Sequence, residues 1–509
     1  MAYPEPSNVA PWYLRNINQA LALDEVSGNV YIRTDANVSI GNANVTVGNV
    51  GINSFGNVDI SGNSLPITGN ITIDPGQTIE VTQGTDPWVV SGNINANITG
   101  GNVAVTGNVG VTGTANVALG GTNLDAFGRL RVSNPVTLFD SQNRYIDGEQ
   151  FSSITATGGN VVYVANESSF NLNVSAASGS SVIRQSKTVQ AYQPGKSLLT
   201  MNTFAMATLK ANLRQRVGYF TADNGIYFEA NGTSLFLVIR SSTTGVVVEE
   251  RIAQASWNGD TLNGAGSSGI TLDPTLTQIF WSDIEWLGVG NVRAGFVING
   301  QFIVCHTFQH ANQPGNTTVY MTTATLNPRY EITNTGATSG VSTMKQICST
   351  VISEGGFTPS TKIGYVTNNT SATRVGSSNT VTSLCSIRLN PSYPDAVVIP
   401  AQIDLLLLDV RYGQFQLIEN ATIANASFSN VSGSVVQSAI HTDTITDGTV
   451  VYAGLNSSRD EVEIGEDIKK RLQLWRYANG TPSTLTLAVA YTATNADLLY
   501  KFGWEELTN

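Results

Sequence analysis

The sequence predicts an all-β chain in which a short N-terminal segment and a repetitive β shaft precede two globular β domains. Three observations carry this prediction. Gly-Asn-Val triplets recur over one segment, turn residues separate short alternating strands over another, and only 12% of the 509 residues are charged. Ordinary soluble proteins carry roughly 25% charged residues. The composition, dominated by Gly, Asn, Ser, Thr and Val, is therefore typical of turn-rich β structure.

Residues 1–36 contain the one clear short helix that the sequence predicts. Pro11 suits a first helical turn, and the apolar residues that follow it fall on one face at helical spacing. The side chains of this prediction are Trp12, Tyr13, Ile17 and Leu21. They can anchor the chain in a larger assembly or cap the end of the shaft, and both interpretations stay open.

Residues 37–122 form the predicted shaft, whose repeat is plainest in "GNVAVTGNVGVTG" at 101–113. If the segment is extended, one face is apolar but thin. Its valines are Val103, Val105, Val109 and Val111. One such strand cannot offset an ordering cost of about 1–2 kcal/mol per residue. The repeat therefore indicates that the strand stacks on copies of itself.

Two architectures satisfy this requirement, a β-helix within one chain and a shaft in which three chains wind together. Some repeats are spaced by seven residues, which reverses strand parity, so the chain must turn or bulge at glycines. Pro66, Pro75 and Pro87 also interrupt the repeat. Because proline is poorly tolerated inside sheets, these interruptions favour the intertwined trimer.

Residues 123–395 are predicted to form a β-sandwich of jelly-roll type. The stretches at 217–242 and 292–308 alternate apolar and polar residues around Asn-Gly turn signals at Asn231 and Asn299. Such repeated hairpins are typical of sandwiches. Residues 396–509 are predicted to form a second, smaller β domain.

Charge and composition exclude several classes of function. The net charge of −11 makes a nucleic-acid partner unexpected, since no basic stripe is present. No run of eighteen apolar residues and no secretory signal occurs, so we expect no membrane insertion. The three cysteines, Cys305, Cys348 and Cys385, match no metal-binding spacing and are expected to be free thiols.

Five long segments resemble the middle region of virion structural proteins from marine and cyanobacterial tailed phages. They are "TNLDAFGRLRVSNPVTLFDSQNRY" (122–145), "QPGKSLLTMNTF" (193–204), "NLRQRVGYFTADNGIYFE" (212–229), "DIEWLGVGNVRAGFVINGQFIVCHTFQHAN" (283–312) and "RYEITNTG" (329–336). The opening at residues 6–34 is similar to the N-termini of cyanophage fibre-like proteins. The resemblance covers about half of the chain and implies a fibre-like virion appendage on head, neck or tail.

The segment "WSDIEW" at 281–286 is the strongest candidate for chemistry. On a strand, Trp281, Asp283 and Glu285 share a face, with the carboxyl groups roughly 6–7 Å apart. This separation is near the range of glycoside hydrolases, and tryptophan can stack on sugar rings. The alternative is that both acids are solvated on the wet face of the strand while Ile284 and Trp286 point to the core. We favour this alternative over an active site, and keep the three residues as a glycan-binding candidate.

Other candidate sites are weaker. His306 and His310 would lie about 13 Å apart on a strand, too far for one ion, so neither a metal nor another cofactor is expected. A basic cluster, which comprises Arg184, Lys187, Lys210, Arg214 and Arg216, is interpreted as an ordinary solvated face rather than as a contact for an anionic polysaccharide.

The resemblance implies a structural protein of the virion, made in the host cytoplasm and released by lysis. We expect no enzyme, because the one acid pair with aromatic neighbours is unremarkable and the shaft is too irregular for a long catalytic β-helix. Expected partners are two further copies of the chain, a host surface polysaccharide, and a portal, neck, baseplate, tail or capsid protein bound by the N-terminus. Two alternatives stay open. One is a tailspike that degrades polysaccharide, and the other is a capsid-decoration fibre without a receptor.

Overall fold

The structure is a computed structural model. It describes residues 134–145, 150–368, 371–375, 379–408, 412–457, 459–464, 470–492 and 495–507, together with two short strands near the N-terminus. These two are β1 (Leu21–Leu23) and β2 (Val30–Ile32), which pair in antiparallel fashion. Leu21, expected on a helix, thus begins a strand. Trp12, Tyr13, Ile17 and the shaft valines lie outside the described residues.

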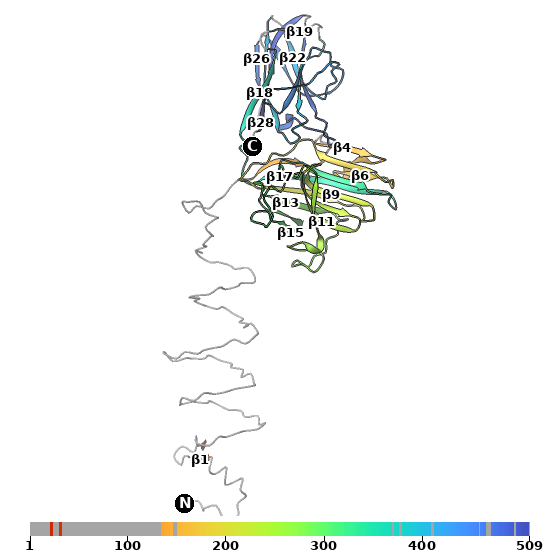
Figure 1. Cartoon of the computed structure of the whole chain (residues 1–509), viewed down its shortest axis with the longest axis vertical. Coiled ribbons are helices and arrows are strands. Elements are labelled where there is room, and N and C mark those ends of the chain that lie inside the picture. The colour runs from red at the N-terminus through yellow and green to blue at the C-terminus, as the bar shows by residue number, and fades with distance from the viewer. Residues whose placement is uncertain are drawn as a thin grey trace, which may run out of the picture. The chain divides into compact units, whose positions relative to one another are not determined.

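The first sandwich, drawn from orange to green in Figure 1, consists of two antiparallel sheets. In its described residues, the seven-stranded sheet has the order β12-β11-β10-β9-β16-β7-β4, with bounds β4 (Phe151–Ala156), β7 (Ser181–Ser186), β9 (Leu213–Phe220), β10 (Gly225–Asn231), β11 (Ser234–Ser241), β12 (Val248–Ala253) and β16 (Pro328–Asn334). The eight-stranded sheet has the order β15-β14-β13-β8-β17-β6-β5, with β3 also paired to β17. Its bounds are β3 (Val136–Ser141), β5 (Asn160–Val164), β6 (Ser169–Val174), β8 (Leu198–Ala205), β13 (Gln278–Ile284), β14 (Val292–Ile298), β15 (Gln301–Phe308) and β17 (Ser342–Ser353).

Alternating side chains of the two sheets build the core of this sandwich. Phe228 of β10 lies at its centre, where its ring is 5.1 Å from that of Phe296 and 6.1 Å from those of Phe204 and Phe280. All four side chains are fully buried. The apolar residues of the alternating pattern thus form the inner face of each sheet, which agrees with the predicted β-sandwich.

The two Asn-Gly signals form the hairpins that the sequence predicts. Asn231 pairs with Ser234 across the β10–β11 turn, and Ile298 pairs with Gln301 across the β14–β15 turn. In the second turn, Asn299 and Gly300 have φ values of 52° and 76°. Two consecutive residues with positive φ are what a type I′ turn requires, and Asn-Gly supplies them at low cost.

The second sandwich, drawn from cyan to blue in Figure 1, also has two antiparallel sheets. In the described residues, its five-stranded sheet contains β18 (Thr361–Thr367), β19 (Thr373–Val375), β21 (Val398–Leu407), β26 (Arg459–Glu463) and β28 (Ala496–Leu507). Its six-stranded sheet contains β20 (Thr382–Leu389), β22 (Tyr412–Glu419), β23 (Ser429–Asn430), β24 (Val436–Ile440), β25 (Thr449–Ser457) and β27 (Thr484–Tyr491).

Strands from both sides of residue 395 share these sheets. β18 pairs with β28 over its full length, and β20 pairs with β24 and β27. The predicted division between two domains at 395/396 therefore falls inside the second sandwich. The pairing instead assigns residues 361–389 to the sheets of the C-terminal strands. Trp504 of β28 is fully buried in their shared core.

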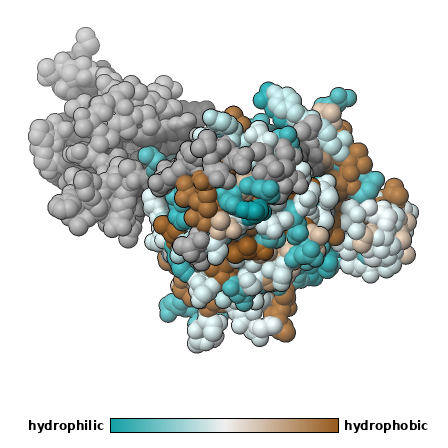
Figure 2. Space-filling model, turned by 90° about the horizontal axis from the view of Figure 1, so that it is seen from above, coloured by the Kyte–Doolittle hydropathy of each residue, from teal (hydrophilic) through white to brown (hydrophobic). Residues whose placement is uncertain are grey.

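Helical structure in the described part of the chain is limited to single 3₁₀ turns at η2 (Ala165–Glu167), η3 (Gln254–Ser256) and η4 (Lys470–Leu472). None of these helices has the length and apolar character needed to cross a membrane. On the face that Figure 2 shows, hydrophobic and hydrophilic side chains are interspersed. The three cysteines are free, and burial raises the pKa of the Cys305 thiol to about 12.

A buried polar cluster interrupts the core of the second sandwich. The imidazole nitrogens of His441 lie 2.7 Å from the Ser383 hydroxyl and 3.0 Å from that of Ser386, which in turn lies 2.6 Å from Thr486 Oγ1. Burial lowers the pKa of His441, and the nearby charge of Asp443 offsets only part of this. The histidine is therefore held in its neutral form by its surroundings.

We expect the stability of the protein to decrease as the pH falls below about 6.5, the pKa of an unperturbed histidine. The unfolded chain then binds a proton that folded His441 resists, so protonation favours unfolding. Burial also lowers the pKa of His306 and His310, which add to the effect. Urea unfolding at pH 7.5 and pH 5.5 measures it, and the His441→Gln variant should show a smaller difference between the two. An equal pH dependence in variant and wild type would contradict this assignment.

Candidate functional site

A groove of about 700 Å³ crosses the eight-stranded sheet from β15 to the end of β17. Strands β13, β14 and β15 and the turn between β13 and β14 supply one part of its wall, and the segments that precede β8 and follow β17 supply the rest. Its lining residues are Gly195, Lys196, Ser197, Asp283, Glu285, Asn291, Arg293, Thr307, Glu354 and Gly355. The groove therefore brings the two acids of the "WSDIEW" segment together with residues from distant parts of the chain.

Asp283 and Arg293 form an ion pair across two neighbouring strands. They face each other in the register of β13 and β14. Both Nε, at 3.1 Å, and Nη2 of Arg293 donate to Oδ2 of Asp283. The carboxylate thus fixes the plane of a guanidinium that is itself more than half exposed. An oriented guanidinium offers its remaining N–H groups to a ligand at little cost in side-chain entropy.

Glu285 follows the end of β13 and is exposed in the groove. Its backbone N–H donates to the carbonyl of Asn291 at 3.1 Å, which closes the turn between β13 and β14. Lys196 lies in the same groove, and its aliphatic stem packs over Gly355, where a Cβ atom would approach within 2.9 Å of the lysine. The groove is therefore lined by the exposed carboxylate of Glu285 and by Lys196.

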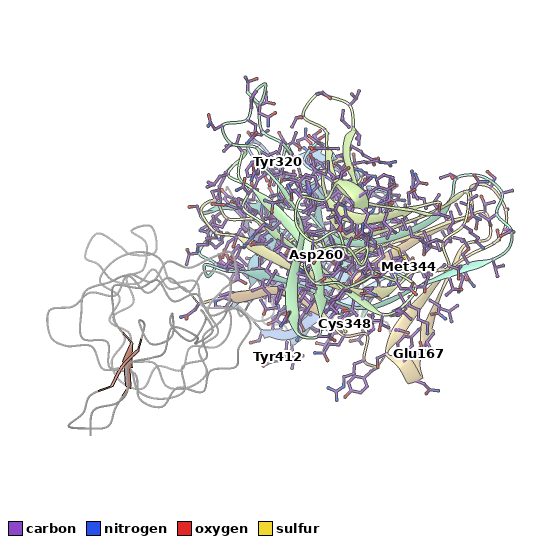
Figure 3. The ribbon with its side chains drawn as sticks, turned by 90° about the horizontal axis from the view of Figure 1, so that it is seen from below. Glu167, Asp260, Tyr320, Met344, Cys348 and Tyr412 are labelled. Atoms are coloured by element: carbon purple, nitrogen blue, oxygen red, sulfur yellow. The ribbon has the colours of Figure 1, made fainter. Side chains whose placement is uncertain are left out.

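An aromatic layer supports the turn that carries Glu285. The rings of Trp286 and Tyr192 meet edge to face at 5.8 Å, and the Trp286 indole N–H donates to the carbonyl of Met321 at 3.2 Å. Beside them, Tyr320, labelled in Figure 3, stacks on His310 at 3.9 Å. Burial, together with the negative charge of Glu285, raises the pKa of Tyr192. The turn is thus packed against the core of the first sandwich.

Trp281 shares the face of Asp283 but presents no ring to a ligand. It is only 3% exposed, because Phe302 packs against it edge to face at 5.4 Å. The sequence could not show this, since Phe302 belongs to β15, two strands away. Ile284 points to the core as expected and is fully buried. Of the glycan-binding candidates, Asp283 and Glu285 line the groove and Trp281 lies buried next to them.

The two histidines of the metal interpretation have other partners. His306 accepts the backbone N–H of Asn258 at 3.1 Å, and His310 lies 2.8 Å from the carbonyl of Gly290. Over the part of the chain that the structure describes, no three His, Cys, Asp or Glu side chains are grouped to hold a metal ion. The candidate chemistry of the groove is thus hydrogen bonding and charge.

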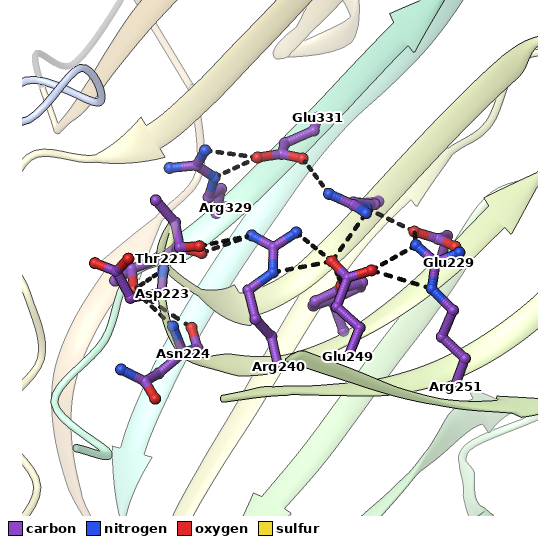
Figure 4. Close-up of polar contacts among 12 residues, drawn as sticks. Thr221, Asp223, Asn224, Glu229, Arg240, Glu249, Arg251, Arg329 and Glu331 are labelled. Atoms are coloured by element: carbon purple, nitrogen blue, oxygen red, sulfur yellow. Dashed lines mark hydrogen bonds and ion pairs between the residues drawn. The ribbon is translucent and has the colours of Figure 1, made fainter. Parts of the chain in front are cut away.

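Seven charged side chains form a network on the outer face of the seven-stranded sheet (Figure 4). They are Arg216, Arg240, Arg251, Arg329, Glu229, Glu249 and Glu331. At the centre, Arg216 Nε lies 2.6 Å from Glu229 and the guanidinium reaches Glu331 at 3.3 Å. Burial opposes ionisation of Glu249, but hydrogen bonds from Arg240 and Tyr227 outweigh it and lower the pKa of Glu249 to about 2.

This network corrects the interpretation of the basic cluster as a solvated face. Arg216 is 4% exposed and ion-paired, and Arg184 is 1% exposed, with its guanidinium over the ring of Phe170 at 3.8 Å. Lys210 is held by the carbonyls of Gly340 and Val341. Burial also lowers the pKa of Arg214. Arg184 and Arg216 are thus part of the interior of the sandwich, whereas Lys187, Lys210 and Arg214 are half-buried.

Comparison with solved structures found proteins that are similar to part of this chain at low sequence identity. No family model and no curated protein matches the sequence. A β-1,3-glucanase from Mycobacterium marinum is similar over 42% of this chain and 98% of its own, with 12% identity and a TM-score of 0.30. The carbohydrate recognition domain of Emp47p is similar over 44% and 97%, with 7% identity and a TM-score of 0.28. A glycoside hydrolase from Bacteroides ovatus, in complex with a mixed-linkage glucan product, is similar over 42% and 99%, with 10% identity and a TM-score of 0.28.

Proposed function

We propose that this chain is a structural protein of a tailed-phage virion, that it forms a trimeric fibre-like appendage, and that its first sandwich binds a neutral polysaccharide of the host surface. The sequence resemblance supports the virion role, and the Gly-Asn-Val repeat supports the trimer. The groove beside β13 supports the binding role. The N-terminal segment would attach the fibre to another virion protein.

The observation that carries the binding proposal is the chemistry of the groove. Its volume of about 700 Å³ lies within the range of small-ligand sites. Three carboxylates, those of Asp283, Glu285 and Glu354, line it together with the two cations Lys196 and Arg293. Such a lining offers both donors and acceptors, which the hydroxyl groups of a sugar can satisfy. The net charge of −11 of the chain disfavours sulfated or uronic polysaccharides.

A single groove of this kind, open to water, is suited to weak binding. Three copies on one fibre, and several fibres on one particle, raise the effective affinity without any new contact. The appendage would therefore work by multivalent attachment. A capsid-decoration fibre would carry the same fold with no ligand in the groove.

Cleavage of the polysaccharide is the second candidate function, since Glu285 is an exposed acid in the groove close to Asp283. Acid–base hydrolysis uses two carboxyl groups that reach the scissile bond from opposite sides. Here Asp283 is engaged by Arg293 on a neighbouring strand. This engagement favours binding over cleavage.

Binding of the full chain to an array of bacterial surface polysaccharides tests the proposal. We expect Glu285→Ala to lower the affinity for the captured polysaccharide about 10-fold or more, because a hydrogen bond to a charged group contributes about 1.5–3 kcal/mol. Glu250→Ala removes an exposed acid of β12 as a control and should leave binding unchanged. Equal binding by both variants would contradict the site. Release of reducing sugar by the wild type, lost in Glu285→Ala, would identify the hydrolase instead.

A further inference from the structure

The turn between β13 and β14 exposes aliphatic side chains next to the groove. Leu287 is 52% exposed and Val289 is 41% exposed. Val319 joins them, because its Cγ1 lies 2.8 Å from the position that a Cβ atom on Gly288 would take, and it is 38% exposed. The turn begins at Glu285 and ends at Asn291, and both of these residues line the groove.

The backbone of this turn adopts an unusual conformation. Leu287 has a φ of 38°, in a left-handed region that residues other than glycine, asparagine and aspartate rarely occupy. Two hydrogen bonds hold it there. The backbone N–H of Leu287 donates to the Tyr192 hydroxyl at 3.2 Å, and that of Gly290 donates to the carbonyl of Trp286 at 2.7 Å.

Packing and hydrogen bonding thus hold Leu287 in a left-handed backbone conformation that asparagine or glycine would adopt at lower cost. The neighbouring chain is fixed as well, since the N–H of Tyr320 donates to the carbonyl of Gly288 at 3.0 Å, which places Val319 beside the turn. The exposure of three aliphatic side chains to water is unfavourable. Contact with a small apolar group of a ligand in the groove would remove part of this apolar surface from water and so favour binding.

We infer that Leu287, Val289 and Val319 form an apolar subsite for a methyl group carried by the bound sugar. This inference rests on the proposed function. A sugar that hydrogen-bonds to Glu285 or Asn291 lies at one end of the turn, so a substituent of that residue can reach the aliphatic side chains. The methyl group can belong to an N-acetyl group or to the C6 position of a 6-deoxy sugar, and both have the same apolar chemistry.

The test compares matched glycans, N-acetylated against de-N-acetylated and 6-deoxy against 6-hydroxyl, on the full chain. We expect the wild type to prefer the methyl-bearing member of one pair by about 10-fold, the discrimination that one methyl-sized group in an apolar site can give. Leu287→Asn removes the aliphatic side chain and keeps a residue that tolerates positive φ. Combined with Val319→Thr, which keeps the shape of the side chain, it should reduce the preference to about 2-fold or less.

The control is Val246→Thr, which changes an exposed valine in the segment before β12 and should preserve the preference. Thermal unfolding of the double variant should match the wild type within a few degrees, which shows that the turn still folds. A wild type that binds glycans without any preference for a methyl group, or a double variant that keeps the preference, overturns the subsite. A wild type that binds no glycan at all instead overturns the proposed function.

Discussion

Replacing Glu229 by glutamine is expected to destabilise the first sandwich by about 3–5 kcal/mol, the cost of removing one partner of a buried ion pair. The Glu229 side chain is completely buried, and it receives hydrogen bonds from Arg216 at 2.6 Å and Arg251 at 3.3 Å. Glutamine fills the same space without the charge. Arg216, whose side chain is 5% exposed, then loses its shortest ion pair at a position where water does not replace it.

Position 167 supplies a matched control for this substitution. Glu167 pairs with Lys345, but both side chains are partly exposed to solvent, at 48% and 35%. Exposed pairs of this kind contribute about 0–1 kcal/mol, so Glu167→Gln should change stability little. Urea unfolding followed by tryptophan fluorescence measures both variants. Equal losses in the two variants would show that the network of Figure 4 does not depend on burial.

The local parts of the fold could be predicted from the sequence, and the long-range parts could not. Asn299 and Gly300 predict their hairpin, because the two central residues of a type I′ turn determine its conformation. β16, in contrast, pairs with β7 and β9, whose sequences lie more than a hundred residues earlier. No local pattern encodes such a pairing. The same limitation explains the domain boundary, because β18 finds its partner β28 at the other end of the domain.

The site divides in the same way. Asp283 and Glu285 could be identified because strand parity alone puts them on one face. Arg293 could also have been identified from the sequence, since a hairpin that closes at Glu285 and Asn291 places Arg293 opposite Asp283. Lys196 and Glu354 could not be identified, because the pairing of β8 with β13 and of β17 with β8 brings them to the groove. The burial of Trp281 likewise depends on Phe302, and thus on tertiary packing.

Changing both Val105 and Val109 to aspartate is expected to abolish trimers and, with them, most of the binding to a polysaccharide surface. The proposed shaft places both valines of three chains at one axis, so six carboxylates would meet there out of water. Buried charges without partners are strongly destabilising. Since linking of weak sites raises avidity by about 10²–10⁴, the monomer should bind an immobilised polysaccharide more weakly by a factor of that order.

The matched control changes Asn102 and Asn108 to aspartate, which adds the same charge to the opposite face of the same strand. Trimers should persist in that variant, because the new carboxylates remain in water. Light scattering gives the mass of each species against the 54.0 kDa chain, and surface binding gives the avidity. Trimers of the valine double variant would disprove the proposed axis. If the wild-type protein is monomeric and still binds the polysaccharide surface with the affinity expected of a trimer, the multivalent mechanism is wrong. A single groove would then be sufficient for binding.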